Sequence, residues 1–181
     1  MPRLNPSDKG FTLIELLIVI TIMISITVAI VPSFAGYIRN QGVKQANEQV
    51  KSDLRNIQNK AVTGALSDQT INSNPVAYWA VRFSNAARYE YFVSDVATSC
   101  PASFSAGQLQ GYADLTVGIE VKSSGNKCIF FNMANGSIST INFPSTNLIV
   151  GYVGSTKTGD CRRIQFNNSG LIYSGTSQVC T

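Results

Sequence analysis

Apolar and polar positions alternate in blocks at the start of this chain. Residues 1–10 are polar and weakly basic, and residues 11–31 (FTLIELLIVITIMISITVAIV) contain a single charged residue, Glu15. An apolar helix of about 20 residues is long enough to cross a bilayer. Because the basic residues precede the apolar run, they favour a cytoplasmic N-terminus and export of everything after the run. The pattern therefore predicts one membrane-spanning helix.

A second apolar pattern follows at helical spacing. Between residues 43 and 66, apolar positions recur in steps of three or four, close to the 3.6-residue period of an α-helix. These positions are Val43, Ala46, Val50, Leu54, Ile57, Ala61 and Ala65. Charged residues occupy the other side, so one face of this half is predicted to be buried. Pro32, Gly36 and Gly42 disfavour a straight helix between the two halves, and Pro32 predicts a kink.

The period changes to two after a turn-rich segment, residues 67–75. Aromatic and β-branched residues then predict a series of strands separated by turn sequences, whereas residues 95–114 are expected to form an irregular connection. The expected strands cover residues 76–83, 89–94, 115–121, 127–132, 137–143, 148–153, 162–166 and 171–174. The fold class is therefore α+β, with a long helix over about residues 11–66 packed on an antiparallel sheet in a head of residues 67–181.

Glu15 is the residue that a simple membrane anchor does not explain. A carboxylate inside an apolar helix costs roughly 2.5–3.5 kcal/mol on insertion scales, and such residues usually have a function.

A cleaved secretory signal is the other alternative to a membrane-spanning helix. It would need a shorter apolar core and a small-residue cleavage site, whereas this core is longer and is followed by Pro32, Ser33 and Phe34.

The octet Lys9–Leu16 (KGFTLIEL) resembles the class III signal of type IV pilins and type II secretion pseudopilins. The resemblance extends over residues 9–32 and includes Pro32, where these pilins often carry a kinking proline. It implies that a prepilin peptidase cuts after Gly10 and methylates the new N-terminus at Phe11. The implied organisation is a cleaved leader (1–10), a transmembrane and filament-core helix (11–37), an amphipathic helix half (38–66) and a head (67–181).

The resemblance also gives Glu15 a role in assembly. Cleavage would create an α-ammonium group at Phe11, and Glu15 lies one helical turn further along the same face. In a filament, the Glu15 carboxylate can pair with the ammonium group of a neighbouring subunit. Each buried charge would then have a partner, which is what makes burial tolerable. We expect this pair to form only when subunits dock in register.

Four cysteines lie in the predicted exported part of the chain. An even number there favours disulfides, and three pairings are possible. The absence of histidine and of C-x-x-C spacing argues against zinc or redox chemistry, so no metal or cofactor is expected. We prefer Cys161–Cys180, which would clamp the last hairpin to the C-terminus, together with Cys100–Cys128. The loop closed by Cys161–Cys180 also resembles the disulfide-bounded C-terminal region of many pilins.

Composition excludes several functions. The chain has 14 Lys and Arg against 10 Asp and Glu, a net charge of +4, and no His. A His-based triad or acid–base pair is therefore impossible, no nucleophile–base set is visible, and we expect no enzyme activity. Lys157, Arg162 and Arg163 loosely resemble the DNA-contacting basic residues of some minor pilins. Three cations support only weak, salt-dependent phosphate binding, and they would also serve to solubilise the head.

The expected function is that of a structural subunit of a type IV pilus-like filament. The resemblance implies other pilin subunits, the prepilin peptidase and an inner-membrane assembly platform as partners. The precursor would reside in the inner membrane before it enters an extracellular pilus or a periplasmic pseudopilus. The alternative is a minor pilin or type II secretion pseudopilin at the filament tip, with DNA as a further partner. In the head, Arg163-Ile164-x-Phe166 and Gly170, followed by a short strand, weakly resemble the H-type minor pseudopilins and related minor pilins.

Overall fold

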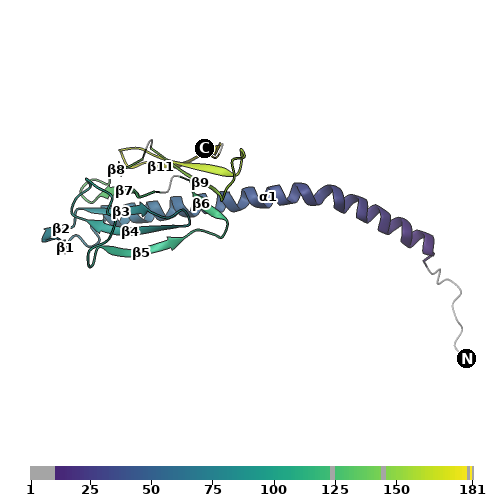
Figure 1. Cartoon of the computed structure of the whole chain (residues 1–181), viewed down its shortest axis with the longest axis horizontal. Coiled ribbons are helices and arrows are strands. Elements are labelled where there is room, and N and C mark those ends of the chain that lie inside the picture. Colours follow the sequence, from purple (N-terminus) through teal and green to yellow (C-terminus); the bar gives the residue numbers. More distant parts are fainter. Residues whose placement is uncertain (1–10, 123–124, 144–145, 179, 181) are drawn as a thin grey trace, which may run out of the picture. The chain divides into compact units, whose positions relative to one another are not determined.

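The computed structural model describes residues 11–122, 125–143, 146–178 and 180, without the side chains at 29, 31–33, 35, 177 and 178 (Figure 1). The predicted leader, including Gly10, lies outside the described residues. The chain divides into two compact units, Met1–Arg39 and Asn40–Thr181. The second unit contains the second half of the long helix and every strand that the structure describes. From here on, the head means this whole unit, so it includes residues 40–66 as well as the expected head of residues 67–181.

One helix, α1 (Leu13–Val62), forms the N-terminal part of the described chain. It ends earlier than the expected residue 66 because Gly64 adopts a left-handed conformation with a φ of 68°. The Gly64 N–H donates to the Ala61 carbonyl, and the Ala65 N–H donates to the Lys60 carbonyl. This pair of bonds is the Schellman motif, which satisfies carbonyls that the helix leaves open. Helix α1 continues without a break through position 32. A kink at Pro32 stays a prediction.

Within the described residues, the strands form three antiparallel sheets. Their orders are β1-β2, β11-β10-β9-β6 and β5-β4-β3-β7-β8. The strands are β1 (Thr70–Ile71), β2 (Asn74–Pro75), β3 (Tyr78–Phe83), β4 (Arg88–Ser94), β5 (Leu109–Asp114), β6 (Ile119–Val121), β7 (Lys127–Asn132), β8 (Ile138–Ile141), β9 (Asn147–Tyr152), β10 (Cys161–Phe166) and β11 (Ile172–Gln178). The α+β prediction, a long helix with antiparallel sheets, is confirmed.

Three segments of the described chain differ from the sequence-based expectation. Strand β5 lies where an irregular connection was expected, and it pairs with β4 at the edge of the five-stranded sheet. A Cβ at Gly111 would lie 2.5 Å from Tyr91 Oη, so any larger residue there would force the Tyr91 ring to move. Residues 115–121 contain only the short strand β6. The expected loop at 67–75 holds the small β1–β2 hairpin, whose turn uses left-handed Asn72 and Ser73.

The second half of α1 buries the predicted apolar face in the core of the head. Val43, Ala46, Val50, Leu54, Ile57 and Ala61 are all buried, and Ala65 packs against them partly exposed. Side chains from both larger sheets complete this core, including Tyr89, Phe131 and Leu148. Burial of a large aliphatic side chain contributes about 1.5–3 kcal/mol. The second half of the helix is therefore a structural part of the head.

A smaller core lies on another part of the five-stranded sheet. Ala80, Phe92, Cys128 and Phe130 are buried there, with Phe104 packed against them. The connection between β4 and β5 supplies Phe104 and is attached to β7 by the Cys100–Cys128 disulfide. The second disulfide, Cys161–Cys180, joins β10 to the C-terminus. The structure thus contains the pairing that we preferred among the three possible ones.

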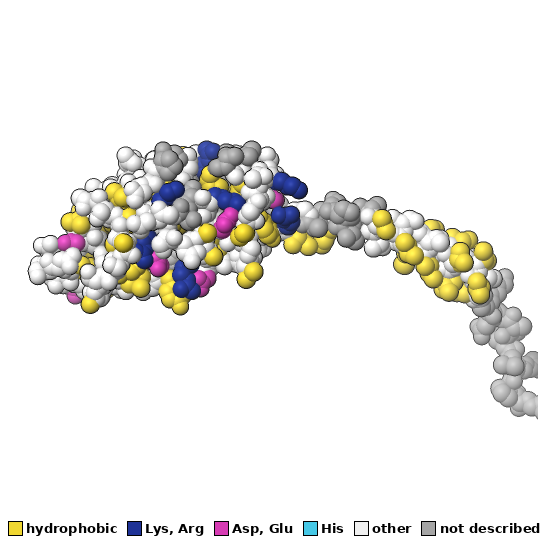
Figure 2. Space-filling view, in the orientation of Figure 1, with side chains coloured by type: hydrophobic (Ala, Val, Ile, Leu, Met, Phe, Trp, Pro, Cys, Tyr) yellow, Lys and Arg dark blue, Asp and Glu magenta, His cyan; other side chains and the backbone are white. Residues whose placement is uncertain are grey.

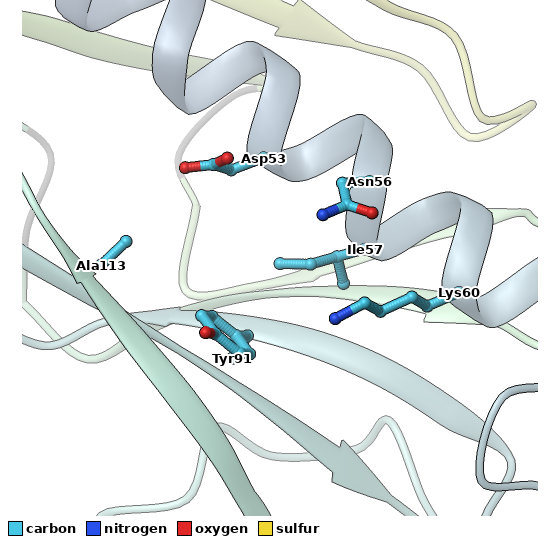
Figure 3. Close-up of a pocket in the computed structure, with 6 residues that line it drawn as sticks. All are labelled: Asp53, Asn56, Ile57, Lys60, Tyr91 and Ala113. Atoms are coloured by element: carbon cyan, nitrogen blue, oxygen red, sulfur yellow. The ribbon is translucent and has the colours of Figure 1, made fainter.

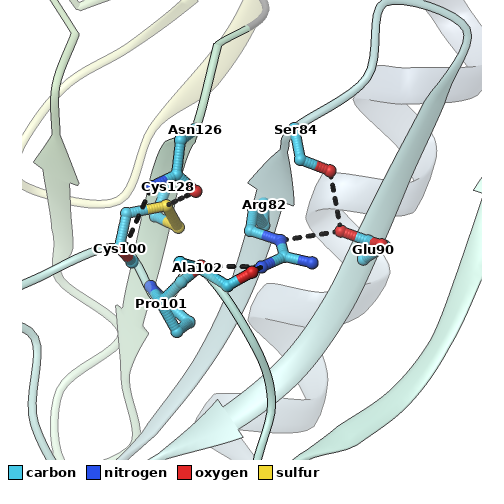
Figure 4. A network of polar contacts seen from close by, with 8 residues as sticks. All are labelled: Arg82, Ser84, Glu90, Cys100, Pro101, Ala102, Asn126 and Cys128. Carbon is cyan, nitrogen blue, oxygen red and sulfur yellow. Dashed lines mark hydrogen bonds and ion pairs between the residues drawn. A yellow bond between two sulfur atoms is a disulfide. The ribbon is translucent and has the colours of Figure 1, made fainter.

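Arg82 holds the same connection through polar contacts (Figure 4). Its Nε donates to Glu90 Oε2 at 2.7 Å, and one terminal nitrogen donates to the carbonyls of Pro101 and Ala102 at 2.6 and 2.9 Å. The guanidinium carbon lies 4.0 Å from the centroid of the Phe104 ring. Ser84 also donates to the Glu90 carboxylate. Arg82 is buried, so its charge is balanced entirely by these neighbours.

Acid should weaken this network by protonating Glu90. Burial raises the pKa of the Glu90 carboxyl, but hydrogen bonds from Arg82 and Ser84 outweigh that effect and lower it overall. The folded state therefore binds this proton less readily than the unfolded state, where a Glu titrates near pH 4.3. The stabilisation is complete above that pKa and is lost as pH falls through the lower folded pKa. We expect the midpoint temperature of thermal unfolding to decrease as the pH is lowered below about 4. In Glu90→Gln this decrease should be less steep. Identical pH profiles would contradict this.

Candidate assembly site at the helix N-terminus

Thr12 and Glu15 together start helix α1. Thr12 is the residue before the first helical position, and its hydroxyl oxygen accepts the Glu15 N–H at 3.3 Å. In return, Glu15 Oε2 accepts the Thr12 N–H at 3.1 Å and the Thr12 hydroxyl at 2.9 Å. This reciprocal arrangement is a capping box, which satisfies N–H groups that the first turn cannot satisfy. Glu15 therefore has a partner within its own chain.

This capping role was not predicted from the sequence. There, the Glu15 carboxylate was expected to pair only with the ammonium group of a neighbouring subunit. The signal was present, because Thr12-Leu13-Ile14-Glu15 before an apolar run has the T-x-x-E pattern of a capping box. Within the described part of the chain, the hydrogen bonds found for the Glu15 carboxylate all go to its Oε2 atom. The other carboxylate oxygen can still accept a hydrogen bond from a second subunit, so the two roles are compatible.

The helix that begins at this cap exposes an apolar surface. The large apolar side chains described between residues 11 and 38 are 47% to 84% exposed, and Figure 2 shows exposed apolar side chains along the first half of the helix on the face in view. They are Phe11, Leu13, Ile14, Leu16, Leu17, Ile18, Val19, Ile20, Ile22, Met23, Ile24, Ile26, Val28, Ile30, Phe34, Tyr37 and Ile38. An apolar surface of this extent normally marks a contact with a protein or a membrane.

Three described hydroxyl groups within this surface bond to their own helix. Thr21 donates to the Ile18 carbonyl at 2.8 Å, and Ser25 donates to the Thr21 carbonyl at 2.7 Å. Thr27 donates to the Met23 carbonyl, also at 2.7 Å. These groups need no partner from outside, so the helix surface presents mainly apolar contacts to a neighbour.

In the part of the chain that is described, no helix is long and apolar enough to cross a membrane.

The basic residues singled out as candidate DNA contacts do not form one open cationic surface. Arg162 and Arg163 lie at an irregularity in the pairing of β10 with β11, and both are half-buried. Arg162 donates to the Asn40 side-chain oxygen at 3.0 Å. Lys157 is exposed in the turn before β10. DNA contact at these residues stays a prediction. Among the described residues, no group of three Cys, Asp or Glu side chains could hold a metal ion.

Comparison with known proteins gives a clear match for the N-terminus. Residues 5–31 match the family described as the prokaryotic N-terminal methylation motif. This segment includes Gly10, Phe11 and Glu15. The match supports the recognition of a type IV pilin or pseudopilin signal, which the sequence analysis based on residues 9–32. No curated protein matches the chain.

Two solved structures of one protein also resemble the fold. Both are crystal structures of the type IV minor pilin FimU from Pseudomonas aeruginosa. In one crystal form the identity is 13% and the TM-score 0.47, with 77% of this chain and 95% of that chain covered. In the other the identity is 14% and the TM-score 0.46, with coverages of 76% and 99%.

Proposed function

We propose that this chain, which carries the N-terminal methylation motif of the type IV pilin and pseudopilin family, is a structural filament subunit made as a prepilin. A prepilin peptidase would cut between Gly10 and Phe11 and methylate Phe11. An inner-membrane assembly platform would then add the subunit to the filament. The observation that carries the proposal is the methylation motif on a helix whose capped N-terminus opens a long exposed apolar surface.

Helix packing in a filament core would provide the driving force for this assembly. The apolar side chains of residues 11–38 are exposed in the isolated chain, and each one that becomes fully buried contributes about 1.5–3 kcal/mol. The contact joins different surfaces of neighbouring subunits, and such a contact produces an open helical filament when it does not close into a ring. The role is structural, and it requires no catalytic group.

The location of the subunit would change during assembly. Before cleavage and assembly, residues 11–37 would hold the precursor in the inner membrane as a single span. After assembly, the same residues would lie in the core of an extracellular pilus or a periplasmic pseudopilus, with the head on the outside. An apolar helix suits both environments, since lipid and the packed helices of neighbouring subunits are both apolar.

Cleavage can be tested by blocking it at Gly10. We expect Gly10→Val to leave residues 1–10 attached, to accumulate in the membrane and to be at least tenfold depleted from sheared filaments. Intact-mass spectrometry should find N-methyl-Phe11 as the first residue of the wild-type subunit. Gly36→Ala is the matched control, because an added Cβ there meets nothing within 4 Å. Efficient incorporation of the uncut variant would overturn the proposal.

Abundance in the same filament preparations separates the remaining roles. A major subunit would dominate the purified filaments, whereas a minor pilin or pseudopilin at the tip would be present in a small proportion. Both results agree with assembly through the N-terminal helix. Absence of the chain from every filament preparation would contradict both roles.

A further inference from the structure

A small pocket lies within the head, between the second half of α1 and strands β4 and β5 (Figure 3). The pocket has a volume of about 160 Å³, below the roughly 300–1,000 Å³ of typical small-molecule sites. It is therefore of a size for one amino-acid side chain. Its lining residues are Asp53, Asn56, Ile57, Lys60, Tyr91 and Ala113.

Lys60 gives one end of the pocket a positive charge. Its Nζ lies 5.2 Å from the centroid of the Trp79 ring and 5.7 Å from that of Tyr91. Such cation–π contacts hold an ammonium group in place while leaving its N–H donors free. Among the described residues, no carboxylate or other acceptor bonds to Lys60 Nζ. A half-buried cation of this kind binds an anion more strongly than a fully hydrated lysine does.

Asp53 lies at the other end of the pocket and does not neutralise Lys60. They are seven positions apart along the helix, a rise of about 10 Å. The buried Tyr89 hydroxyl donates to Asp53 Oδ2. Burial, reinforced by this hydrogen bond to the carboxylate, raises the pKa of the Tyr89 phenol above its ordinary value, so the phenol stays protonated. The Asp53 carboxylate is thus held by Tyr89, and the pocket keeps distinct anionic and cationic ends.

We propose that this pocket binds the side chain of a glutamate residue from a protein partner. The glutamate carboxylate would accept hydrogen bonds from Lys60, and the Asn56 side-chain amide would supply a further donor. The two methylene groups would lie on the apolar floor made by Ile57, Tyr91 and Ala113. A glutamate fits better than a free inorganic anion, because the floor favours an apolar stem. The proposal goes beyond the filament role and depends only on the head.

Short peptides provide a direct test on the full-length chain in detergent micelles. The probes are acetyl-Ala-Glu-Ala-amide and acetyl-Ala-Gln-Ala-amide, which differ only in the charge of one side chain. Trp79 is the only tryptophan in the chain and contacts Lys60, so its fluorescence reports on the pocket. We expect a saturable change with the glutamate peptide, and a dissociation constant at least tenfold larger for the glutamine peptide.

Variants then assign the binding to Lys60. Lys60→Gln should weaken binding of the glutamate peptide at least tenfold. The measurement is the change in the NMR chemical shift of the Ala113 amide as peptide is added. Lys60→Met should do the same if the first variant is poorly folded. Lys44→Met is the matched control, because Lys44 is exposed on the same helix and does not line the pocket. Equal responses to the two peptides, a response that never saturates, or unchanged binding in the Lys60 variants would overturn the proposal.

Discussion

Glu15→Ala should reduce incorporation into filaments at least tenfold, and Thr12→Val should reduce it several-fold. The Thr12 and Glu15 side chains cap the first turn of α1 together. Loss of an N-cap costs about 0.5–2 kcal/mol, which corresponds to a factor of roughly 2–30 in an equilibrium. Glu15→Ala also removes the charge that can pair with the ammonium group of a neighbour. The measurement is the ratio of subunit in sheared filaments to subunit in membranes.

Two further variants separate capping from charge. Glu15→Gln keeps an oxygen that can accept the Thr12 N–H but carries no charge, so its defect reports the charge pair alone. Thr21→Val is the matched control for Thr12→Val, because the Thr21 hydroxyl bonds only to the carbonyl of Ile18 in the contacts found for the described helix. We expect normal filaments from Thr21→Val. Normal filaments from Thr12→Val would show that the capping box has no part in assembly.

Arg82→Ala should lower the free energy of unfolding of the head by about 3–5 kcal/mol. Arg82 is buried and the Glu90 side chain is only 21% exposed, so removal of Arg82 leaves a partly desolvated carboxylate without its partner, a change that costs about 3–5 kcal/mol in buried pairs. The Pro101 and Ala102 carbonyls also lose their donor, so the connection between β4 and β5 should loosen. Urea denaturation of the full-length protein in detergent measures the change, since the Trp79 signal reports on the core.

Arg88→Ala is the control for this prediction. Arg88 also pairs with a carboxylate, that of Asp114 at 2.6 Å, but the two side chains are 44% and 55% exposed. Exposed ion pairs contribute about 0.2–1 kcal/mol, so this variant should lose at most that amount. Equal losses for Arg82→Ala and Arg88→Ala would show that burial does not set the value of these pairs.

The helix was predictable because its signals are local. Apolar spacing located the buried face of residues 43–65, and the structure buries those side chains in the core. The end of the helix was less accurate, since it depends on the left-handed conformation of Gly64. Glu15 was recognised from the motif as important, and its capping contact could have been found from the Thr12–Glu15 spacing alone.

Other features required the folded chain. Strand β5 has no run of β-branched residues, and it forms because β4 pairs with it and because the Tyr91 ring covers Gly111. The contacts of Arg82 join residues 8 to 20 positions apart in the sequence, and the pocket brings Lys60 beside Ala113. No periodicity in the sequence reports contacts of this kind.

The sequence by itself determined the signal for cleavage, the long helix, the α+β class and the even set of cysteines. These depend on neighbouring residues, whose spacing and apolar content act over one or two helical turns. Only the tertiary structure decided which residues surround Arg82, where β5 pairs and where Lys60 meets two aromatic rings. Those arrangements depend on how distant segments pack. The capping contact of Glu15 is not one of them, because its partner Thr12 lies only three residues away and the T-x-x-E spacing in the sequence already contains it.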